Sequence, residues 1–524
     1  MSGKIAFVLI VATLLSVIGA VIVAWRYRAA MQVLMKTPLE AASTAAAAAP
    51  GTALVAAADT PAVPVTLADN RRARTRMIAA FVALTLAMAL TRTLIMQVAA
   101  DGPVTLKTVA ALCATYAWPV VPVLAVLGRW RRWRLVGALL LWFVAAVALI
   151  GWRTTDAVSV EQIFFWMLLD IVLPLIIVTA LCLGGATRAV GPWLAPLFIL
   201  FSWSSQAGVD LLAALVDADS PLIHWLAERV GAVGGIALFA LAPWAVAWWP
   251  AKALARRLAW AYARRRISEL FYLFTAVWVI ALTGPALAAM ADMGWGALAF
   301  FLPLLWIPLG ARAMRATTGR RPRGRPPTLL VLRVFQQDAN VQDLFDRVVE
   351  RWRITGNTVL IAGTDLADRT IDADDIFTFL DGRLAERFIH RPGDVARRLA
   401  SFEWQPDAEG RYRVNECYCH DTTWKLALAE LLRISDVVLM DLRNFQASNA
   451  GCLHELRELA SQRGLARVVV LINRDTALDA AQAAVATAPA ERFVWLRQEA
   501  ASPPATAAVL AALFGTPAAA GVGG

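Results

Sequence analysis

Charged residues and cysteines are both scarce in this chain, and each scarcity excludes a class of protein. Of its 524 residues, 17% are charged and 59% are hydrophobic. That balance lies outside the range of soluble globular proteins and is typical of chains that cross a membrane several times. The five cysteines have no framework spacing, which argues against disulfides and indicates a reducing compartment.

Common nucleotide-binding and hydrolase motifs are absent too. The sequence has no Walker-type phosphate loop, dinucleotide GxGxxG motif, kinase signature or serine nucleophile elbow, which excludes the commonest ATPases, dehydrogenases and hydrolases. A net charge of +11 is compatible with nucleic-acid binding, but Lys and Arg are concentrated in short loops beside apolar segments and in one linker. Membrane orientation requires that placement, so we predict no nucleic-acid partner.

Long apolar segments dominate the chain up to about residue 315. A helix needs about 20 apolar residues to cross the hydrocarbon core, where the backbone must satisfy its own hydrogen bonds. The pattern predicts an α-helical polytopic membrane bundle of about nine spans, with eight or ten as alternatives. The segments run approximately over 5–25, 77–99, 107–128, 134–152, 162–184, 190–216, 227–249, 268–290 and 294–314.

The loops between these segments alternate in charge. Those after the odd-numbered segments are basic, for example Arg71 to Arg76 and Lys252 to Arg266, whereas the others are acidic or nearly neutral. Because basic loops stay on the cytoplasmic side, we expect a multi-pass protein of the cell inner (plasma) membrane. Its N-terminus would lie outside and its C-terminal part in the cytoplasm, with the lipid bilayer as its partner.

The domain organisation follows from these segments. We predict an uncleaved N-terminal membrane anchor, because the first apolar run is too long for a signal peptide. The predicted parts are the anchor at 1–36, an Ala/Pro-rich cytoplasmic linker at 37–76, the transmembrane bundle at 77–315, a basic Pro-rich linker at 316–327, a cytoplasmic α/β domain at 328–500 and a disordered tail at 501–524.

Two charged residues, Arg92 and Asp170, fall inside predicted spans. Charge at that depth costs a few kcal/mol, so each side chain should face a partner or water. The interpretations that stay open are a proton or ion path, a structural pair, or an Arg92 side chain that reaches outward to the membrane surface. Since acidic residues do not cluster along one segment, a transporter with a regulatory tail is the weaker alternative.

The C-terminal part alternates strands and helices. Predicted strands at 329–335, 357–362, 411–418, 437–442, 467–472 and 492–496, most of them apolar, are separated by helical patterns. Continuous apolar strands between helices predict a sheet covered on both faces, here a doubly wound, mainly parallel flavodoxin-like sheet. Ligands in such sheets bind at the carboxyl ends of the strands.

One passage, residues 435–460, resembles TIR-type domains. A helix ending in Ser435 leads into the apolar strand Val437 to Leu442, then a polar loop, then a helix that opens with Ser448, Cys452, Glu455 and Leu456. The first strand and acidic turn, Val334 to Asp338, add to the resemblance. Nucleoside deoxyribosyltransferase-like domains share a similar strand, loop and Glu-bearing helix, and both families include members that cleave a bond between a ribose-type sugar and a base.

The resemblance implies a function for the cytoplasmic domain: cleavage of the N-glycosidic bond of NAD or a related nucleotide, in signalling or defence. Glu455 matches the catalytic glutamate, and a carboxylate there would stabilise the oxocarbenium charge that develops on the sugar. NAD or the nucleotide would be the substrate, with no cofactor required. The expected ligand-binding residues are Phe335 or Phe445 for stacking on a base, Arg443 and Asn444 for ribose or phosphate, Asp365 for a hydroxyl, and the amides of Asn449 to Gly451 for phosphate.

Other interpretations of these residues remain. Glu455 could be a solvated helix residue, in which case the domain would be a non-catalytic signalling or scaffold module that self-associates into a homo-oligomer. The run Cys417 to His420, with Cys452 and His454, suggests zinc, but the spacing is not that of a zinc ribbon or finger. We therefore predict buried thiols and no metal.

Overall fold

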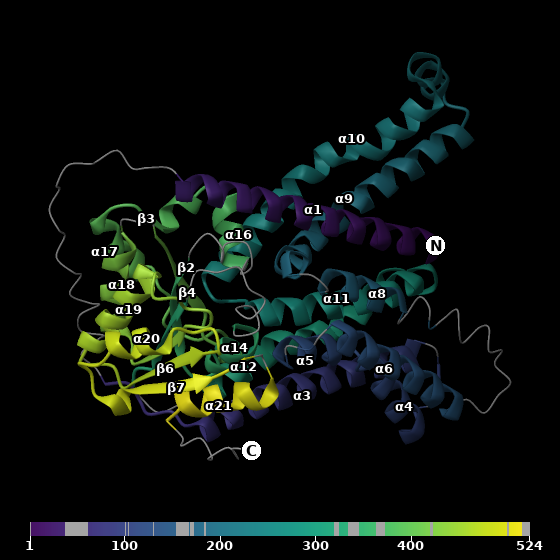
Figure 1. The fold of residues 1–524 in the computed structure, drawn as a ribbon. Coiled ribbons are helices and arrows are strands. Elements are labelled where there is room, and N and C mark those ends of the chain that lie inside the picture. Colours follow the sequence, from purple (N-terminus) through teal and green to yellow (C-terminus); the bar gives the residue numbers. More distant parts are fainter. Residues whose placement is uncertain are drawn as a thin grey trace. The chain divides into compact units, whose positions relative to one another are not determined.

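The structure is a computed structural model that describes residues 2–36, 61–99, 101–102, 104–128, 130, 132–153, 167, 172–182, 185–318, 324–333, 345–362, 373–419, 423–499 and 502–515. The chain divides into two compact units. Unit 1 comprises Met1–Arg26, Ile78–Arg312 and Ile371–Phe377, and unit 2 comprises Tyr27–Met77, Ala313–Thr370 and Thr378–Gly524. Figure 1 shows their elements in chain order.

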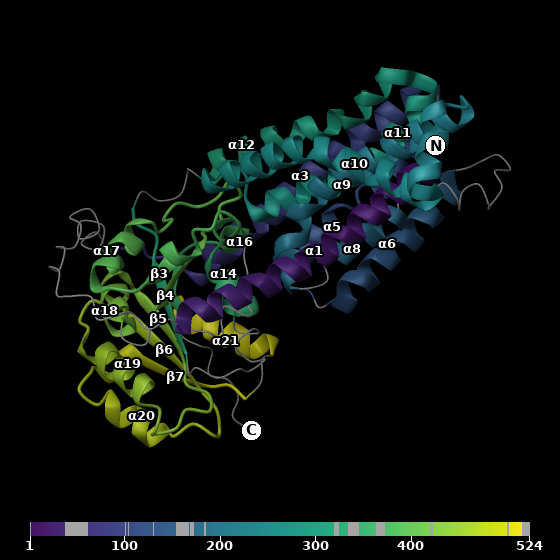
Figure 2. The same ribbon diagram turned by 90° about the horizontal axis from the view of Figure 1, so that it is seen from above.

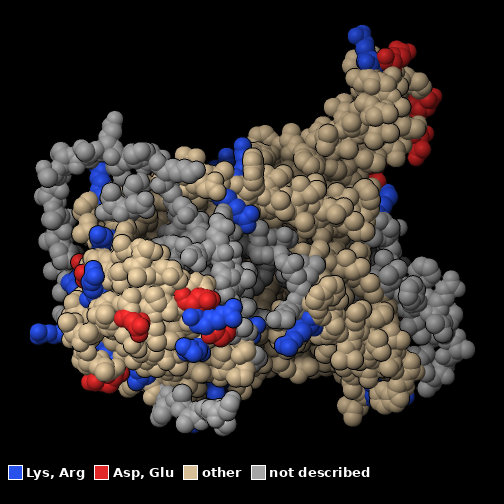
Figure 3. All heavy atoms as spheres, in the orientation of Figure 1, with Lys and Arg blue, Asp and Glu red and all other residues tan. Residues whose placement is uncertain are grey.

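Unit 1 is helical. Three helices are shared between the units: the end of α1 Ser2–Lys36, the start of α3 Leu67–Ala99 and the end of α12 Trp306–Thr318 belong to unit 2. The other described helices of unit 1 are α4 Leu106–Tyr116, α5 Val120–Gly128, α6 Arg132–Arg153, α8 Leu173–Cys182, α9 Gly185–Asp217, α10 Pro221–Ala263, α11 Glu269–Met293 and the 3-10 helix η2 Gly294–Leu305. Much of the exposed surface of α9 and α10 is uncharged, and acidic and basic side chains gather at the end where α9 leads into α10 (Figure 3).

Seven of the described helices are long and apolar enough to cross a membrane, or eight if α4 and α5 form one bent span. The prediction of a multi-pass helical bundle is thereby supported, with fewer described spans than the nine expected. The predicted span at 162–184 lies partly outside the described residues, and α8 within it has ten residues. The predicted span at 107–128 bends by 46° between α4 and α5, where Pro119 lacks a backbone donor.

Unit 2 holds a seven-stranded sheet in the order β3-β4-β2-β1-β5-β6-β7. Every pair is parallel. The strands are β1 Thr328–Arg333, β2 Asn357–Ala362, β3 Phe388–Ile389, β4 Val414–Cys419, β5 Val437–Asp441, β6 Arg467–Ile472 and β7 Phe493–Arg497. The six predicted strands are present, and the two-residue β3 was not predicted because its apolar run is too short to register.

Helices cover both faces of this sheet (Figure 2). On one face α17 Pro392–Ala400, α18 Trp424–Ile434, α19 Ala450–Ser461 and α20 Leu478–Ala484 enclose the main hydrophobic core. Strand side chains alternate between faces, and those of the second face, such as Leu329 and Leu439, are also buried. On the second face α21 Pro503–Leu513 packs against β5 and β6. It also contacts the π-helix η3 Phe345–Val349, which α14 Glu350–Trp352 continues. The short helices η4 Leu384–Arg387 and η5 Ala490–Arg492 complete the unit, together with the end of α16 Ala373–Leu380, whose first residues belong to unit 1.

The prediction of a disordered tail at 501–524 is wrong over 503–513, where the chain forms α21. The hydroxyl of Ser502 caps this helix by accepting from the Ala505 amide at 3.2 Å. Val509 and Leu513 are buried, and Phe514 stacks on Trp352 with ring centroids 4.8 Å apart. The alanine-rich composition of the segment favours a disordered tail, but its apolar residues form one face of α21 that packs on the sheet.

Both predicted linkers are partly ordered. Residues 67–76 of the first linker form the opening turns of α3, where the Asn70 side chain donates to the Arg351 carbonyl and to Thr355 Oγ1, both at 2.8 Å. In the second linker the Arg325 guanidinium donates two hydrogen bonds to the Asp436 carboxylate, from Nη2 to Oδ1 at 2.5 Å and from Nη1 to Oδ2 at 2.9 Å. The end of this linker is therefore fixed to the sheet by an ion pair.

Candidate functional site

The strand order locates the candidate site. β1 lies between β2 and β5, so the chain winds outward from β1 in both directions, and ligands bind at the carboxyl ends of strands at such a reversal. Residues 334–344, 363–372 and 420–422, which follow β1, β2 and β4, lie outside the described residues. Phe335 and Asp365 are among them, so their predicted roles stay predictions.

Glu455 sits in the second turn of α19, the helix that follows β5. The side chain is buried, at 3% exposure, on the same face as Cys452, Leu456 and Leu459. These three neighbours are part of the main core. Glu455 is therefore not a solvated surface charge, and its carboxylate is held where water is scarce.

Cys452 precedes Glu455 by one helical turn. Burial, and secondarily the charge of Glu455, raise the pKa of the Cys452 thiol to about 12. A thiol with that pKa is protonated at neutral pH, whereas the thiolate is the reactive form. Of the two, Glu455 is the side chain suited to stabilise positive charge.

Arg443, predicted to hold ribose or phosphate, is paired with a carboxylate. Its Nε donates to Asp441 Oδ1 at 2.8 Å and its Nη2 to Asp441 Oδ2 at 2.6 Å. Both side chains are buried at the carboxyl end of β5. Asp441 fixes the guanidinium in place and balances its charge. This role was not predicted from the sequence. The available signal was an aspartate at the end of an apolar strand, two residues before an arginine.

Asn444 ties the loop after β5 to the loop after β6. Its amide oxygen accepts from Asn473 Nδ2 at 2.7 Å, while its backbone N–H donates to Asn473 Oδ1 at 2.9 Å. Its φ is 63°, a left-handed conformation that asparagine tolerates better than most residues. The structure thus gives Asn444 a loop-fixing role, and its predicted contact with ribose or phosphate remains a prediction.

Phe445 lies within the main core and is fully buried. A ring enclosed by the core offers no face for a base, so the burial argues against the prediction that Phe445 stacks on a ligand. The loop after β5 turns back at this point, where the Phe445 amide donates to the Leu442 carbonyl at 3.0 Å. The turn directs the Phe445 ring into the core.

The start of α19 is open. Asn449 occupies the N-cap position, but no side chain caps the helix. Its Oδ1 accepts from the Gln446 amide at 2.8 Å instead. Gly451 is exposed, and a Cβ added there would meet nothing within 4 Å. Two of the predicted phosphate donors are already engaged, because the Asn449 and Ala450 amides donate to the carbonyls of Gln446 and Ser448, both at 2.9 Å. The phosphate contact therefore stays a prediction, with open space shown only beside Gly451.

Of the two cysteines of β4, Cys417 is buried and Cys419 is half-buried. Burial raises the pKa of Cys417 to about 12 and shifts the pKa of Cys419 in the same direction. Among the residues that the structure describes, no three His, Cys, Asp or Glu side chains gather as metal ligands. His420 lies outside the described residues.

Within the helical unit Arg92 is fully buried on α3. Its guanidinium carbon lies 3.9 Å from the centre of the Tyr116 ring on α4, a cation–π contact that stabilises a cation away from water. The interpretation in which Arg92 reaches outward does not hold. Asp170, the other predicted intramembrane charge, lies outside the described residues.

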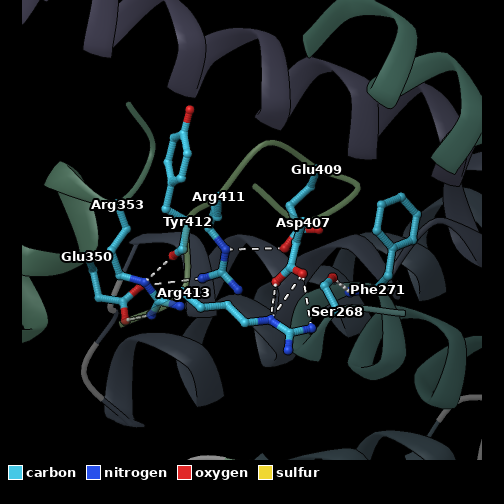
Figure 4. Close-up of polar contacts among 9 residues, drawn as sticks. All are labelled: Ser268, Phe271, Glu350, Arg353, Asp407, Glu409, Arg411, Tyr412 and Arg413. Atoms are coloured by element: carbon cyan, nitrogen blue, oxygen red, sulfur yellow. Dashed lines mark hydrogen bonds and ion pairs between the residues drawn. The ribbon is translucent and has the colours of Figure 1, made fainter. Parts of the chain in front are cut away.

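A partly buried ion-pair network joins residues just before β4 to α14 and Arg353 (Figure 4). Arg353 and Arg411 both contact Glu350, at 2.7 and 3.3 Å, and Arg413 contacts Asp407 at 3.1 Å. The turn it holds explains why β4 starts at Val414 rather than at 411 as predicted. Sequence reasoning missed this network because its partners come from segments far apart in the chain.

Comparison of the chain with protein-family models, with curated proteins and with solved structures finds no match.

Proposed function

We propose that this multi-pass membrane protein carries a cytoplasmic TIR-like domain that cleaves the N-glycosidic bond of NAD or a related nucleotide. The observation that carries the proposal is the placement of Glu455. The Cys-Leu-His-Glu-Leu segment that resembles active TIR-type domains lies on the helix directly after β5, and its glutamate is buried.

The strand order supports the resemblance. Five neighbouring strands run β2-β1-β5-β6-β7, which becomes 2-1-3-4-5, the flavodoxin-like order, when β3 and β4 are treated as an insertion. Those two strands belong to the segment between β2 and α18. The helix after the third strand of this order is α19, an arrangement that would bring Glu455 near the reversal point beside β1.

The chemistry needs a carboxylate and little else from the protein. As the bond between the ribose C1′ and the nicotinamide nitrogen breaks, its electron pair leaves with nicotinamide and positive charge develops on the sugar. The Glu455 carboxylate would stabilise or capture that charge. The oxygen of a water molecule then bonds to C1′ and its proton is released, giving ADP-ribose.

Orientation in the membrane rests on two arguments. Residues of α1 from Tyr27 onward and of α3 up to Met77 are grouped with the α/β unit, so the connection between these helices would share its side of the membrane. That connection precedes a basic run, Arg71 to Arg76, and basic segments stay inside. This supports a cytoplasmic α/β unit and an outside N-terminus in the inner membrane.

The experiment uses the full-length protein reconstituted in membranes, because clustering there favours self-association. We expect nicotinamide release from NAD by the natural chain and loss of release in Glu455→Gln. Glu458→Gln, on the same helix and half-buried, is the matched control and should release nicotinamide normally. Release that persists in Glu455→Gln would remove Glu455 from the reaction.

A non-catalytic scaffold is the second candidate. One observation favours it: Glu455 shares its helix face with core residues Cys452 and Leu456, where a carboxylate can serve the packing of the fold. This candidate predicts concentration-dependent homo-oligomers with NAD left intact.

A further inference from the structure

The C-terminal end of α1, residues 27–36, belongs to unit 2. The apolar part of α1, Phe7–Leu34, is 28 residues long, or about 42 Å at 1.5 Å per residue, whereas the hydrocarbon core is about 30 Å thick. The apolar length beyond the hydrocarbon thickness falls on residues from Tyr27 onward, which belong to unit 2. Lipid alone does not account for the apolar length of α1.

Two side chains one turn apart account for it instead. Tyr27 and Met31 are both almost fully buried, and their four-residue spacing puts them on one face of the helix. The Tyr27 ring meets Phe379 of α16 edge to face, with centroids 5.9 Å apart. Gln32, which directly follows Met31, is exposed, so the helix presents one face to the α/β unit.

The hydroxyl of Tyr27 reaches the sheet. It lies 3.5 Å from the hydroxyl of Tyr418 in β4, and Tyr418 donates its proton to Glu416 Oε2 at 2.7 Å. A tyrosine hydroxyl has one proton, so Tyr27 is the donor in the first contact. All three side chains are buried, and Tyr418 also stacks on Phe388 of β3, with centroids 5.4 Å apart.

From these contacts we infer that residues 27–36 of α1 are the input element of the α/β unit: a rotation or shift of α1 reaches β4 through Tyr27 and Tyr418. α1 is one continuous helix, and Ser2–Lys36 contains no proline. A helix without a break carries a rotation along its length. β4 pairs with β2 and β3, and β2 pairs with β1, so a displacement of β4 would reach the strand next to β1 at the candidate site.

The first test measures amide hydrogen exchange in the full-length protein. In Tyr27→Ala we expect peptides covering 414–419 to exchange at least tenfold faster, with peptides covering 467–472 unchanged. Gln32→Ala is the matched control and should behave like the natural chain. Unchanged exchange of 414–419 in Tyr27→Ala overturns the inference.

Tyr27→Phe keeps the ring and removes the hydroxyl. It tests the inference if Tyr27→Ala speeds hydrogen exchange throughout unit 2. Faster exchange confined to 414–419 supports the inference, and exchange identical to the natural chain contradicts the hydroxyl contact on which it rests.

The second test changes the helical phase of α1. One alanine inserted between Val23 and Ala24 rotates Tyr27 by about 100° relative to the preceding helix, and four alanines rotate it by about 40°. Transmission through α1 predicts strong loss of protection at 414–419 with one alanine and a smaller loss with four. Equal protection in both insertions would show that α1 packs on the sheet without controlling it. Neither test depends on NAD cleavage.

Discussion

Asp441 and Arg443 form a two-pronged buried ion pair at the carboxyl end of β5, with donor–acceptor distances of 2.8 and 2.6 Å. The Arg443 backbone amide adds a third contact, to Asp441 Oδ1 at 3.2 Å. The carboxylate thus sets both the side chain and the backbone at the start of the loop that leads to α19.

Replacing Asp441 with Asn should destabilise this end of the sheet. Removing one partner of a buried ion pair leaves the other charge poorly compensated and typically costs about 3–5 kcal/mol. We expect the opening free energy of the β5 amides, measured by hydrogen exchange, to fall by about that amount. Arg457→Gln, at an exposed position on α19, should change it by less than ~0.5 kcal/mol; an equal loss in both variants would contradict a special role for the pair.

Alkaline pH should destabilise unit 2 through Cys417. Burial raises the pKa of this thiol from an ordinary value of 9.0 to about 12. Because the unfolded chain loses the proton first, the stabilisation is complete below pH 9 and falls as pH rises toward 12, by up to roughly 1.4 kcal/mol per pH unit. Urea unfolding of the full-length protein in detergent should show this slope, and Cys417→Ala should reduce it. A slope that Cys417→Ala leaves unchanged would assign the pH dependence to other groups.

α21 should be a structural part of unit 2. Leu513 is buried where the helix ends beneath the sheet, and Leu→Ala in a core costs about 2–5 kcal/mol. We expect Leu513→Ala to lower the opening free energy of β6, the strand whose Arg467 donates to the Ala512 carbonyl at 2.7 Å. Ala507→Ser, on the exposed face of α21, is the control. An unchanged β6 in Leu513→Ala would mean that α21 does not cover the sheet.

The contact between Arg92 and Tyr116 should stabilise the helical unit, and a double-mutant cycle measures its interaction free energy. A desolvated cation–π pair contributes about 2 kcal/mol. Arg92→Lys and Tyr116→Leu should each lower the thermal stability of the detergent-solubilised protein, and the double variant should lose less than the sum. Additive losses would show that the two side chains do not interact.

The strands of unit 2 could be predicted from the sequence because short apolar runs, such as the four residues from Val437 to Met440 in β5, stand out between polar loops. Sequence reasoning placed Glu455 on a helix directly after that strand, but could not tell whether the carboxylate would be buried, since burial depends on how α19 packs against the sheet. Tyr27 was equally invisible: a tyrosine at the end of a membrane helix looks like an interfacial residue. Its contact with Tyr418 joins positions 391 residues apart, and no local pattern encodes such a pairing.

The central claim is that Glu455 supports cleavage of an N-glycosidic bond, and product analysis in ¹⁸O-labelled water tests it most directly. Full-length protein in membranes should convert NAD to unlabelled nicotinamide and ADP-ribose carrying one ¹⁸O, with Glu455→Gln forming neither. Intact NAD after incubation, cleavage at the pyrophosphate into two mononucleotides, or labelled ADP-ribose from Glu455→Gln would contradict the claim.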